Sequence, residues 1–263
     1  MAVYTKIGLD EINLIEKNFS IGKILNYSGI KKGIENTNYL IKSKKRKFIL
    51  TIFEKRVNSR DLPFFMKLMS GLAKSKIKCP KPVENKKGKY LFKLKGKNAC
   101  LVTFLEGKDK NNLNSKECFV IGKNIARLHN SSKKLRIFRK NSLSVNSWGP
   151  LLKKISRKIN KKFKDLTDNM KTDYIQIKKL WPKKLPTGII HGDLFIDNIF
   201  FFKGSFYGFI DFYFASNDYY AYDLATSVNA LCFNKQNNKF IMNKNKSSNL
   251  LKGYQSVRKL TKL

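Results

Sequence analysis

Acidic residues and histidines are scarce in this chain of 263 residues. Only 18 Asp and Glu stand against 55 Lys and Arg, so the formal net charge is +37, and there are two histidines. A basic surface attracts polyanions, but the lysines run along the whole chain and no nucleic-acid-binding motif accompanies them. Lys also greatly outnumbers Arg, which is the preferred residue for bidentate phosphate and base contacts. We therefore interpret the charge as a solvated basic surface and predict no specific nucleic-acid partner.

Metal-binding and redox patterns of cysteine are absent. The four cysteines, Cys79, Cys100, Cys118 and Cys232, are scattered, without a C-x-x-C pair or a neighbouring cluster of histidines. We expect them to be reduced, buried thiols. Long apolar runs are also missing, and charges interrupt the apolar residues at the N-terminus, which argues against a signal peptide or a membrane span. A cytoplasmic protein without a membrane partner is the expectation.

The first hundred residues carry mostly strand signals. Apolar and β-branched residues lie between turn residues in three segments: 23–30, 36–43 and 47–54. One helix is predicted after them, with Asp61 as its N-cap and Pro63 in its first turn, and it ends before the Cys79-Pro80-Lys81-Pro82 segment. These patterns predict a small antiparallel sheet with one helix, spanning residues 1–103.

The pattern changes to helical after a buried strand at 99–104. Residues 104–107 form a short connector, and beyond it apolar residues recur at helical spacing in 115–129, while 151–163 resembles a basic amphipathic helix. The chain therefore predicts an α+β fold of two lobes: a sheet-rich lobe over 1–103, the connector, and a larger, mainly helical lobe over 108–263.

The segment 188–212 carries the chemistry. Two apolar strands, 199–202 and 206–210, are separated by Lys203-Gly204-Ser205, which predicts a tight hairpin. The residue before the first strand and the residue after the second then lie side by side, and these are Asn198 and Asp211. An amide oxygen beside a carboxylate suits Mg²⁺, which completes its octahedron with water and substrate phosphates.

Asp193 precedes this pair by one loop and could accept the proton of an incoming hydroxyl, as the catalytic-loop aspartate of kinases does. The alternative is that His191-Gly192-Asp193 is an ordinary turn and that Asp211 caps another element. The compound pattern argues against it, because D-x-x-x-x-N followed by an apolar hairpin and I-D-F seldom arises by chance.

Residues 191–198 and 210–212 resemble the signature of the aminoglycoside and choline phosphotransferase superfamily. Further strings are similar to the homoserine kinases of that superfamily: IDFYFA at 210–215, the D-x-x-AYD of 218–223, FILTIFEKR at 48–56, DLPFF at 61–65 and LVTFLEG at 101–107. The likeness begins at Met1 and is still readable at Gln255. It implies a protein-kinase-like fold that uses ATP and Mg²⁺, with Asp193 as the base and Asn198 and Asp211 as metal ligands.

The same resemblance implies transfer of the ATP γ-phosphate to the hydroxyl of L-homoserine, a step towards threonine. Two alternatives stay open. The acceptor could be choline, an aminoglycoside or a related alcohol or amine, or the chain could keep a kinase fold and bind polyanions without catalysis. Nothing in the pattern predicts the oligomeric state or the residues that recognise the acceptor.

Nucleotide binding is expected on the first hairpin and the connector. Gly29, Gly33, Asn36 and Asn38 lie in a stretch that resembles the family's counterpart of the kinase glycine-rich loop, although an ordinary hairpin turn explains the same spacing. The backbone from Phe104 to Glu106 would face the adenine, by analogy with the connector of kinases.

The pattern departs from kinases in two places. Thr51 stands near the position where the third strand usually carries a phosphate-binding lysine, and the helix after it contains no glutamate. Lys55 or a loop amide is left as a substitute. The chain also ends at Leu263, where homoserine kinases usually continue into further helices, which leaves open a compact active enzyme, a truncated product or a folded protein of weakened activity.

Three further polar residues have assigned roles. We expect Asp223 either to hold the catalytic loop or to cap a solvent-exposed helix, and His191 to orient that loop through a backbone hydrogen bond. His129 is explained by a favourable contact with the dipole at the end of its helix.

Overall fold

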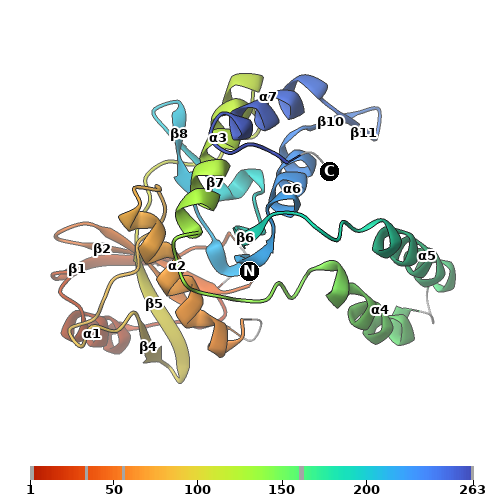
Figure 1. Ribbon diagram of the computed structural model, residues 1–263. Coiled ribbons are helices and arrows are strands. Elements are labelled where there is room, and N and C mark those ends of the chain that lie inside the picture. Colours follow the sequence, from red (N-terminus) through yellow and green to blue (C-terminus); the bar gives the residue numbers. More distant parts are fainter. Residues whose placement is uncertain (1–2, 33–34, 55–56, 160–162, 262–263) are drawn as a thin grey trace.

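The computed structural model describes residues 3–32, 35–54, 57–159 and 163–261. Its N-terminal part is a sheet with flanking helices, and its C-terminal part is mainly helical (Figure 1). The sheet has the order β1-β2-β3-β5-β4 and is antiparallel throughout. Its strands are β1 (Ile24–Gly29), β2 (Thr37–Ser43), β3 (Lys47–Ile52), β4 (Leu91–Leu94) and β5 (Lys97–Thr103). The predicted small antiparallel sheet is confirmed.

The two faces of the sheet bury different partners, because side chains alternate along each strand. On β5, Leu101 belongs to a cluster with Ile15 of α1 (Leu9–Asn18), whereas its neighbour Cys100 belongs to a cluster with Phe65 of α2 (Leu62–Lys74). The second cluster continues into the C-terminal part through Ile121. The helix α2 therefore shares one core with elements on both sides of the connector.

The expectation of one helix beside the sheet was wrong, because α1 precedes the first strand. Ile12 and Ile15 lie on its buried face, and Phe19 follows at its C-cap with 2% of its surface exposed. The spacing of three and four residues was present in the sequence. Between Ile15 and Phe19, Glu16 is half-buried and accepts a hydrogen bond from Ile24 N, whereas Lys17 is exposed.

The helix α2 starts at the predicted residues, but the Asp61 side chain has another partner than the one expected of a helix cap. Asp61 occupies the N-cap position and Pro63 lies in the first turn, yet the Asp61 side chain makes no cap hydrogen bond. Its carboxylate accepts instead from Nε of Arg139, at 2.7 Å. After α2, the proline-containing segment is extended and pairs with β5, since Val83 N donates to Leu101 O at 2.8 Å. The predicted extended chain is confirmed there.

The C-terminal part contains five helices and three pairs of short strands among its described residues. The helices are α3 (Ser115–Ser132), α4 (Val145–Ile159), α5 (Lys164–Leu180), α6 (Tyr220–Leu231) and α7 (Lys244–Gln255). The strand pairs are β6 (Thr187–Ile190) with β9 (Ser216–Tyr219), β7 (Ile199–Phe202) with β8 (Ser205–Phe209), and β10 (Phe233–Gln236) with β11 (Lys239–Met242). Three 3₁₀ turns are also present: η1 (Ser59–Asp61), η2 (Ile196–Asn198) and η3 (Phe212–Phe214).

Two glycines allow α3 and α7 to approach closely. A Cβ added at Gly122 of α3 would lie 1.9 Å from the carbonyl oxygen of Leu250, and one at Gly253 of α7 would lie 1.9 Å from that of Phe119. No side chain fits at such a distance, so both positions require glycine. The close packing buries Tyr254.

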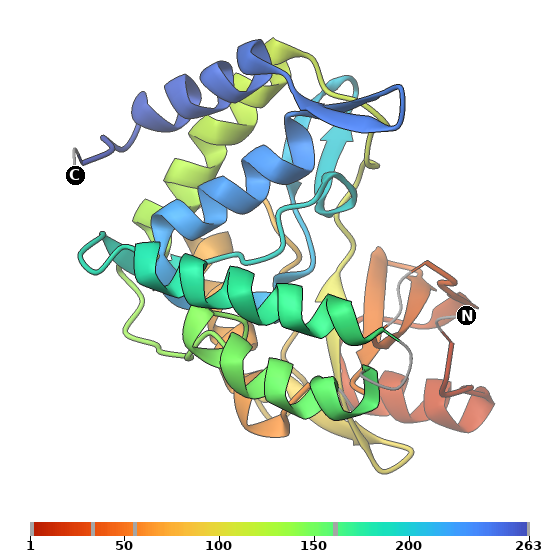
Figure 2. The ribbon, with the colours of Figure 1, turned by 90° about the vertical axis from the view of Figure 1, so that its right-hand side faces the viewer.

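Helices α4 and α5 form a hairpin that projects away from α3, α6 and α7 (Figures 1 and 2). The predicted amphipathic helix at 151–163 exists but begins earlier, at Val145, and ends at Ile159. Pro150 lies inside the helix as its sixth residue, where its missing N–H removes one backbone hydrogen bond. Phe163 lies instead at the N-cap of α5.

All four cysteines are free and buried, as expected from the sequence. Burial raises the pKa of the Cys79 and Cys100 thiols to about 12, so neither is a reactive thiolate at neutral pH. Within the described part of the chain, no helix has the length and apolar character that crossing a bilayer requires.

Candidate active site

The hairpin of β7 and β8 brings Asn198 next to the residues that follow β8. Its two-residue turn, Lys203-Gly204, has positive φ at both positions, 49° and 81°, which is the backbone of a type I′ turn. At the open end the pairing continues, because Ile210 N donates to Asn198 O at 3.0 Å. Asp211 is the next residue. The predicted juxtaposition of Asn198 and the end of the second strand is confirmed.

Asp193 and Asn198 are joined directly. The Asn198 amide nitrogen donates to both the backbone oxygen and Oδ2 of Asp193, each at 2.8 Å. Partial burial raises the pKa of the Asp193 carboxyl; the hydrogen bond from Asn198 opposes this shift, and the charges of Asp197 and Glu35 reinforce it. A carboxylate with a raised pKa, held in one orientation, is suited to accept a proton.

Asp211 follows the hairpin in a left-handed backbone conformation, with φ 60° and ψ 66°. Its side chain keeps access to solvent, yet protein atoms surround it closely. Desolvation and the nearby charge of Asp193 raise the pKa of Asp211 to about 6, and a hydrogen bond from the backbone of Tyr213 acts in the opposite direction. The carboxylates at this place therefore repel one another.

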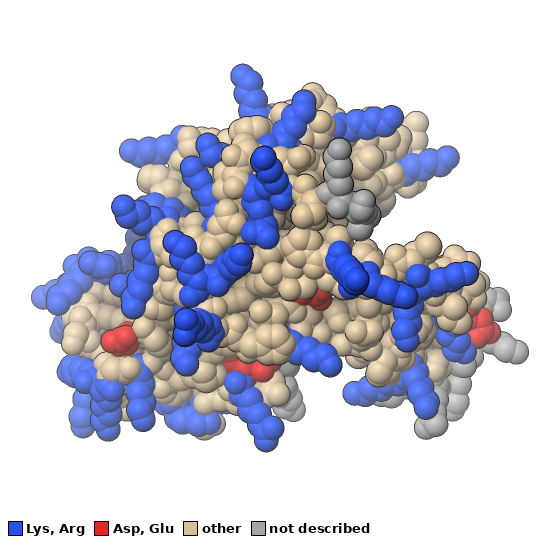
Figure 3. Space-filling view, viewed as in Figure 1, with Lys and Arg blue, Asp and Glu red and all other residues tan. Residues whose placement is uncertain are grey.

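This repulsion indicates a place for a cation. Lys and Arg side chains are spread over the visible face of the molecule in Figure 3, whereas the charges of Asp197 and Glu35 raise the pKa of Asp193 and of Asp211. Asn198 turns its amide nitrogen to Asp193, which leaves Oδ1 as its oxygen ligand. One amide oxygen, one carboxylate and substrate phosphates make an oxygen donor set that fits Mg²⁺.

No group of three or more His, Cys, Asp and Glu suited to hold a metal occurs within the ranges described above. A magnesium site that takes most of its ligands from phosphates and water does not need such a group.

Asp223 holds the catalytic loop. Its carboxylate accepts from the backbone N–H of His191 and of Gly192, each at 2.9 Å, and its side chain is completely buried. Gly192 has φ 80°, and a Cβ there would lie 2.9 Å from Phe214 O. The loop-holding role is confirmed, and the alternative of a solvent-exposed cap is wrong.

His191 orients the same loop, as predicted. Its Nε2 lies 2.9 Å from the carbonyl oxygen of Ile210, and Asp193 N donates to its Nδ1 at 3.3 Å. These contacts require the tautomer that carries the proton on Nε2. Burial lowers the pKa of His191, which favours this neutral form. The histidine thereby connects the Asp193 loop to the strand that precedes Asp211.

The explanation of His129 by a helix dipole was wrong. Its side chain is completely buried, with Nε2 2.9 Å from Asp223 Oδ2 and Nδ1 2.9 Å from the hydroxyl of Tyr254. The sequence contained a signal for this burial, because His129 follows Ile121 and Ile125 at intervals of four residues on α3. The contact with Asp223 could not be read from that spacing.

The residues expected around the nucleotide lie at two ends of the sheet: Asn38 pairs with Thr51 on β3, whereas the connector follows Thr103, which pairs with Phe48 at the other end of that strand. Asn36 Oδ1 accepts from Glu54 N at 3.3 Å, and Asn38 Oδ1 accepts from Thr51 Oγ1 at 2.8 Å, so both amides tie β2 to β3. Gly29 ends β1. Gly33 and Lys55 lie outside the described residues. A role for Gly29, Asn36 and Asn38 in nucleotide binding stays a prediction.

The connector is fixed to both parts of the molecule. Phe104 N donates to Lys47 O at 3.1 Å, and the ammonium of Lys47 lies 3.1 Å from the carboxylate of Glu106. Beyond it, Lys108 and Phe201 exchange backbone hydrogen bonds of 2.8 and 3.0 Å. Gly107 has φ 108°, and a Cβ there would lie 2.5 Å from Phe201 O. Adenine binding by the backbone at 104–106 also stays a prediction.

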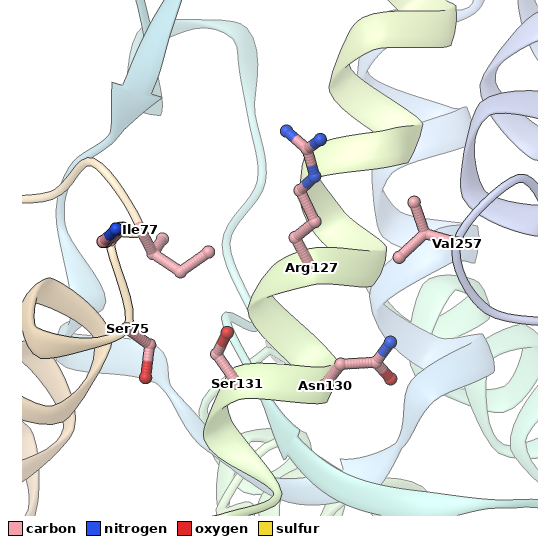
Figure 4. A pocket seen from close by; sticks show the side chains of 7 residues that line it. Ser75, Ile77, Arg127, Asn130, Ser131 and Val257 are labelled. Atoms are coloured by element: carbon pink, nitrogen blue, oxygen red, sulfur yellow. The ribbon is translucent and has the colours of Figure 1, made fainter.

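A pocket of about 360 Å³ lies away from these residues. It is found between the C-terminal end of α2 and helix α3, where Arg127, Asn130 and Ser131 line one side (Figure 4). It is open and shallow and contains none of the loop or hairpin residues described above. The chemistry of the carboxylates, and not the size of this pocket, identifies the candidate site.

Comparisons with known proteins show the family of this chain. Residues 26–259 match the family model described as "Phosphotransferase enzyme family". The chain is 41% identical over 261 residues to a protein named homoserine kinase from Sinorhizobium medicae, covering 99% of this chain and 79% of that one. It is 42% identical to one of the same name from Agrobacterium fabrum, with 99% and 80% covered.

Solved structures show the fold. An amicoumacin kinase in complex with AMP-PNP and Ca²⁺ superimposes with a TM-score of 0.69 at 16% identity, over 94% of this chain and 78% of that one. A spectinomycin phosphotransferase in complex with ADP and spectinomycin gives 0.67 at 17% identity, over 95% and 80%. The predicted kinase-like α+β fold is confirmed.

Proposed function

The chain belongs to the phosphotransferase enzyme family and is an ATP-dependent kinase for an alcohol group, and from that premise we propose that it is a homoserine kinase. The γ-phosphate of ATP passes to the side-chain hydroxyl of L-homoserine, and the products are ADP and O-phospho-L-homoserine, on the route to threonine. The observation that carries the proposal is the hydrogen bond between Asp193 and Asn198, with Asp211 directly after the Ile210 that pairs with Asn198, in a chain 41% identical to a homoserine kinase over 261 residues.

In this mechanism Asp193 accepts the proton of the acceptor hydroxyl. The hydroxyl oxygen bonds to the γ-phosphorus of ATP as the bond between that phosphorus and the oxygen bridging the β- and γ-phosphates breaks. Asn198 keeps Oδ2 of Asp193 in place through its 2.8 Å hydrogen bond. Asn198 Oδ1 and the Asp211 carboxylate would hold Mg²⁺. When bound there, the ion would supply neutralisation of charge on the phosphates. Asp223 and His191 keep the loop and the hairpin in register, so that base and metal ligands act on one phosphate.

The acceptor is tested by coupled ADP release from the purified protein with Mg-ATP. L-homoserine, choline, L-serine and an aminoglycoside are compared, and the Asp193→Ala variant serves as the blank. We expect only L-homoserine to accelerate ATP use. Faster turnover with choline or the aminoglycoside than with L-homoserine would show that this compound is the acceptor and that the chain is not a homoserine kinase. Absence of turnover with all four, in protein that binds ATP, would contradict a kinase function for this chain.

Removal of the Asp211 carboxylate tests the metal role separately. We expect Asp211→Asn to weaken Mg-ATP binding at least about 10-fold, because a ligand of the ion is lost. Isothermal titration with Mg-ATP and with metal-free ATP measures the difference. The Asp197→Asn variant is the matched control, since it removes a neighbouring negative charge without removing a proposed ligand. Equal Mg-ATP affinity in Asp211→Asn and the unchanged protein would refute the metal role.

A further inference from the structure

Arg139 lies in the segment between α3 and α4 and contacts the turn that follows Asp211. Its Nη1 lies 3.0 Å from Ala215 O and 3.5 Å from Phe214 O, and its backbone exchanges hydrogen bonds with Asn217. In that exchange Asn217 N donates to Arg139 O at 2.7 Å, and Arg139 N donates to Asn217 Oδ1 at 2.9 Å. Arg139 thus contacts three positions, Phe214 at the end of η3 and Ala215 and Asn217 directly after it.

The same guanidinium reaches the sheet-rich part of the molecule. Its Nε donates to Asp61 Oδ2 at 2.7 Å, and only 15% of the Arg139 side chain and 29% of the Asp61 side chain are exposed. The cation also lies over the ring of Phe65 at 5.1 Å. Phe65 in turn packs edge-on against Tyr213 of η3, with ring centres 5.6 Å apart. Helix α2 therefore touches the turn after Asp211 both directly and through Arg139.

At the N-cap position of α2, the Asp61 carboxylate bonds to Arg139 in place of the helix-cap hydrogen bond that its position would allow. Arginine is also uncommon here, at eight of the 55 basic residues. A guanidinium can serve a carboxylate and two carbonyl oxygens at once because its donors form a planar fork, and a lysine ammonium cannot reproduce that geometry.

We propose that Arg139 is a positioning residue for Asp211: by linking Asp61 of α2 to the carbonyl oxygens of Phe214 and Ala215, it holds the turn that sets the direction of the Asp211 carboxylate. The proposal rests on the metal role given to Asp211 in the proposed function. Asp211 has a left-handed backbone at φ 60°, a conformation that is uncommon for residues other than glycine and that contacts around the turn help to maintain. The Arg139 contacts supply that constraint from the far side of η3.

The test uses Arg139→Lys, Arg139→Gln and Asp61→Asn, with Arg136→Gln as the matched control at an exposed arginine three residues away. Hydrogen–deuterium exchange of the nucleotide-free proteins follows the peptide covering 211–217. Electron paramagnetic resonance of Mn²⁺ in the presence of AMP-PNP measures metal affinity. Circular dichroism and the melting temperature establish that each variant is folded.

We expect exchange at 211–217 to accelerate about 10-fold in both Arg139 variants and Mn²⁺ affinity to fall about 10-fold, as the loss of one charge-assisted hydrogen bond predicts. Asp61→Asn should shift both quantities in the same direction by less, and Arg136→Gln should shift neither. The Lys variant should behave like the Gln variant, because the charge alone does not restore the fork.

Folded Arg139 variants with the exchange and Mn²⁺ affinity of the control would overturn the proposal. Exchange that rises equally along the whole chain would overturn it too, because it would indicate a general stabilising role. These outcomes differ from a failure of the proposed function, which would appear in the ADP assay of the unchanged protein. Neither exchange nor Mn²⁺ binding requires the acceptor to be L-homoserine.

Discussion

Replacing Asp193 with alanine is expected to reduce turnover about 10³-fold while Mg-ATP affinity stays within a factor of about three. The carboxylate is the only group that the proposed mechanism uses to accept the hydroxyl proton, and general-base catalysis contributes roughly 10² to 10⁴ in rate. It does not contact the nucleotide in this mechanism, so binding should persist. Single-turnover measurements of phosphoryl transfer and titration of Mg-ATP provide the two values.

The Asp193→Asn variant makes this test sharper. Its amide keeps the size of the carboxylate and can still accept the hydrogen bond from Asn198, which is 2.8 Å long in the native protein, but it cannot accept a proton. Both variants should therefore lose activity together. An asparagine variant that retains more than a tenth of the native rate would show that Asp193 positions groups without acting as the base.

The second large effect is expected on stability, at Asp223. Its buried carboxylate accepts from the backbone of His191 and Gly192 and faces Nε2 of His129, all at 2.9 Å. In Asp223→Asn the amide nitrogen must face one of these donors, and a buried, charge-assisted hydrogen bond is lost. Such a change costs about 3–5 kcal/mol. The melting temperature should fall by roughly 10 °C for a chain of this size.

Urea unfolding at several pH values measures this loss. Burial alone would raise the pKa of Asp223, but the hydrogen bond and charge of His129, with the charge of His191, lower it below its ordinary value of 3.8. Stability from a depressed carboxyl pKa is complete above the unfolded value and disappears as the pH falls through the folded value. The difference between native protein and variant should therefore not shrink above about pH 4.

Asp168→Asn is the control for this experiment. Asp168 pairs with Lys171 on the surface of α5, where 61% of its side chain is exposed. An exposed pair contributes at most about 1 kcal/mol, so its loss should be small at every pH. A loss at Asp223 no larger than at Asp168 would contradict the central place of Asp223 in the loop.

Elements with a strong local pattern were predictable from the sequence. The apolar runs of β3 and β5 and the Lys203-Gly204 turn are each recognised from residues within a few positions of one another. The hairpin could therefore be drawn, and with it the meeting of Asn198 with the end of β8. The helix α1 was missed because its apolar positions are few, and α4 was misplaced because Pro150 obscured its start.

The residues of the candidate site also fall into two groups, those predictable from a local motif and those that only the structure brings together. Asp193, Asn198 and Asp211 lie within 19 positions and in a motif whose spacing carries their relation. The residues that hold them come from far along the chain: His129 lies 94 positions from Asp223, and Asp61 lies 78 positions from Arg139. Neither pair has a sequence spacing from which the contact could have been predicted.

The sequence by itself determined the chemistry that can occur here: a base, an amide and a carboxylate at the two ends of a hairpin, within an α+β chain of the phosphotransferase type. Only the tertiary structure decided which buried groups hold these residues. The physical reason is that local patterns specify turns and apolar faces, whereas the partner of a buried charge is chosen by the packing of distant helices. The contacts of Asp61 with Arg139 and of Asp223 with His129 exist because α2, α3 and α6 surround the loop.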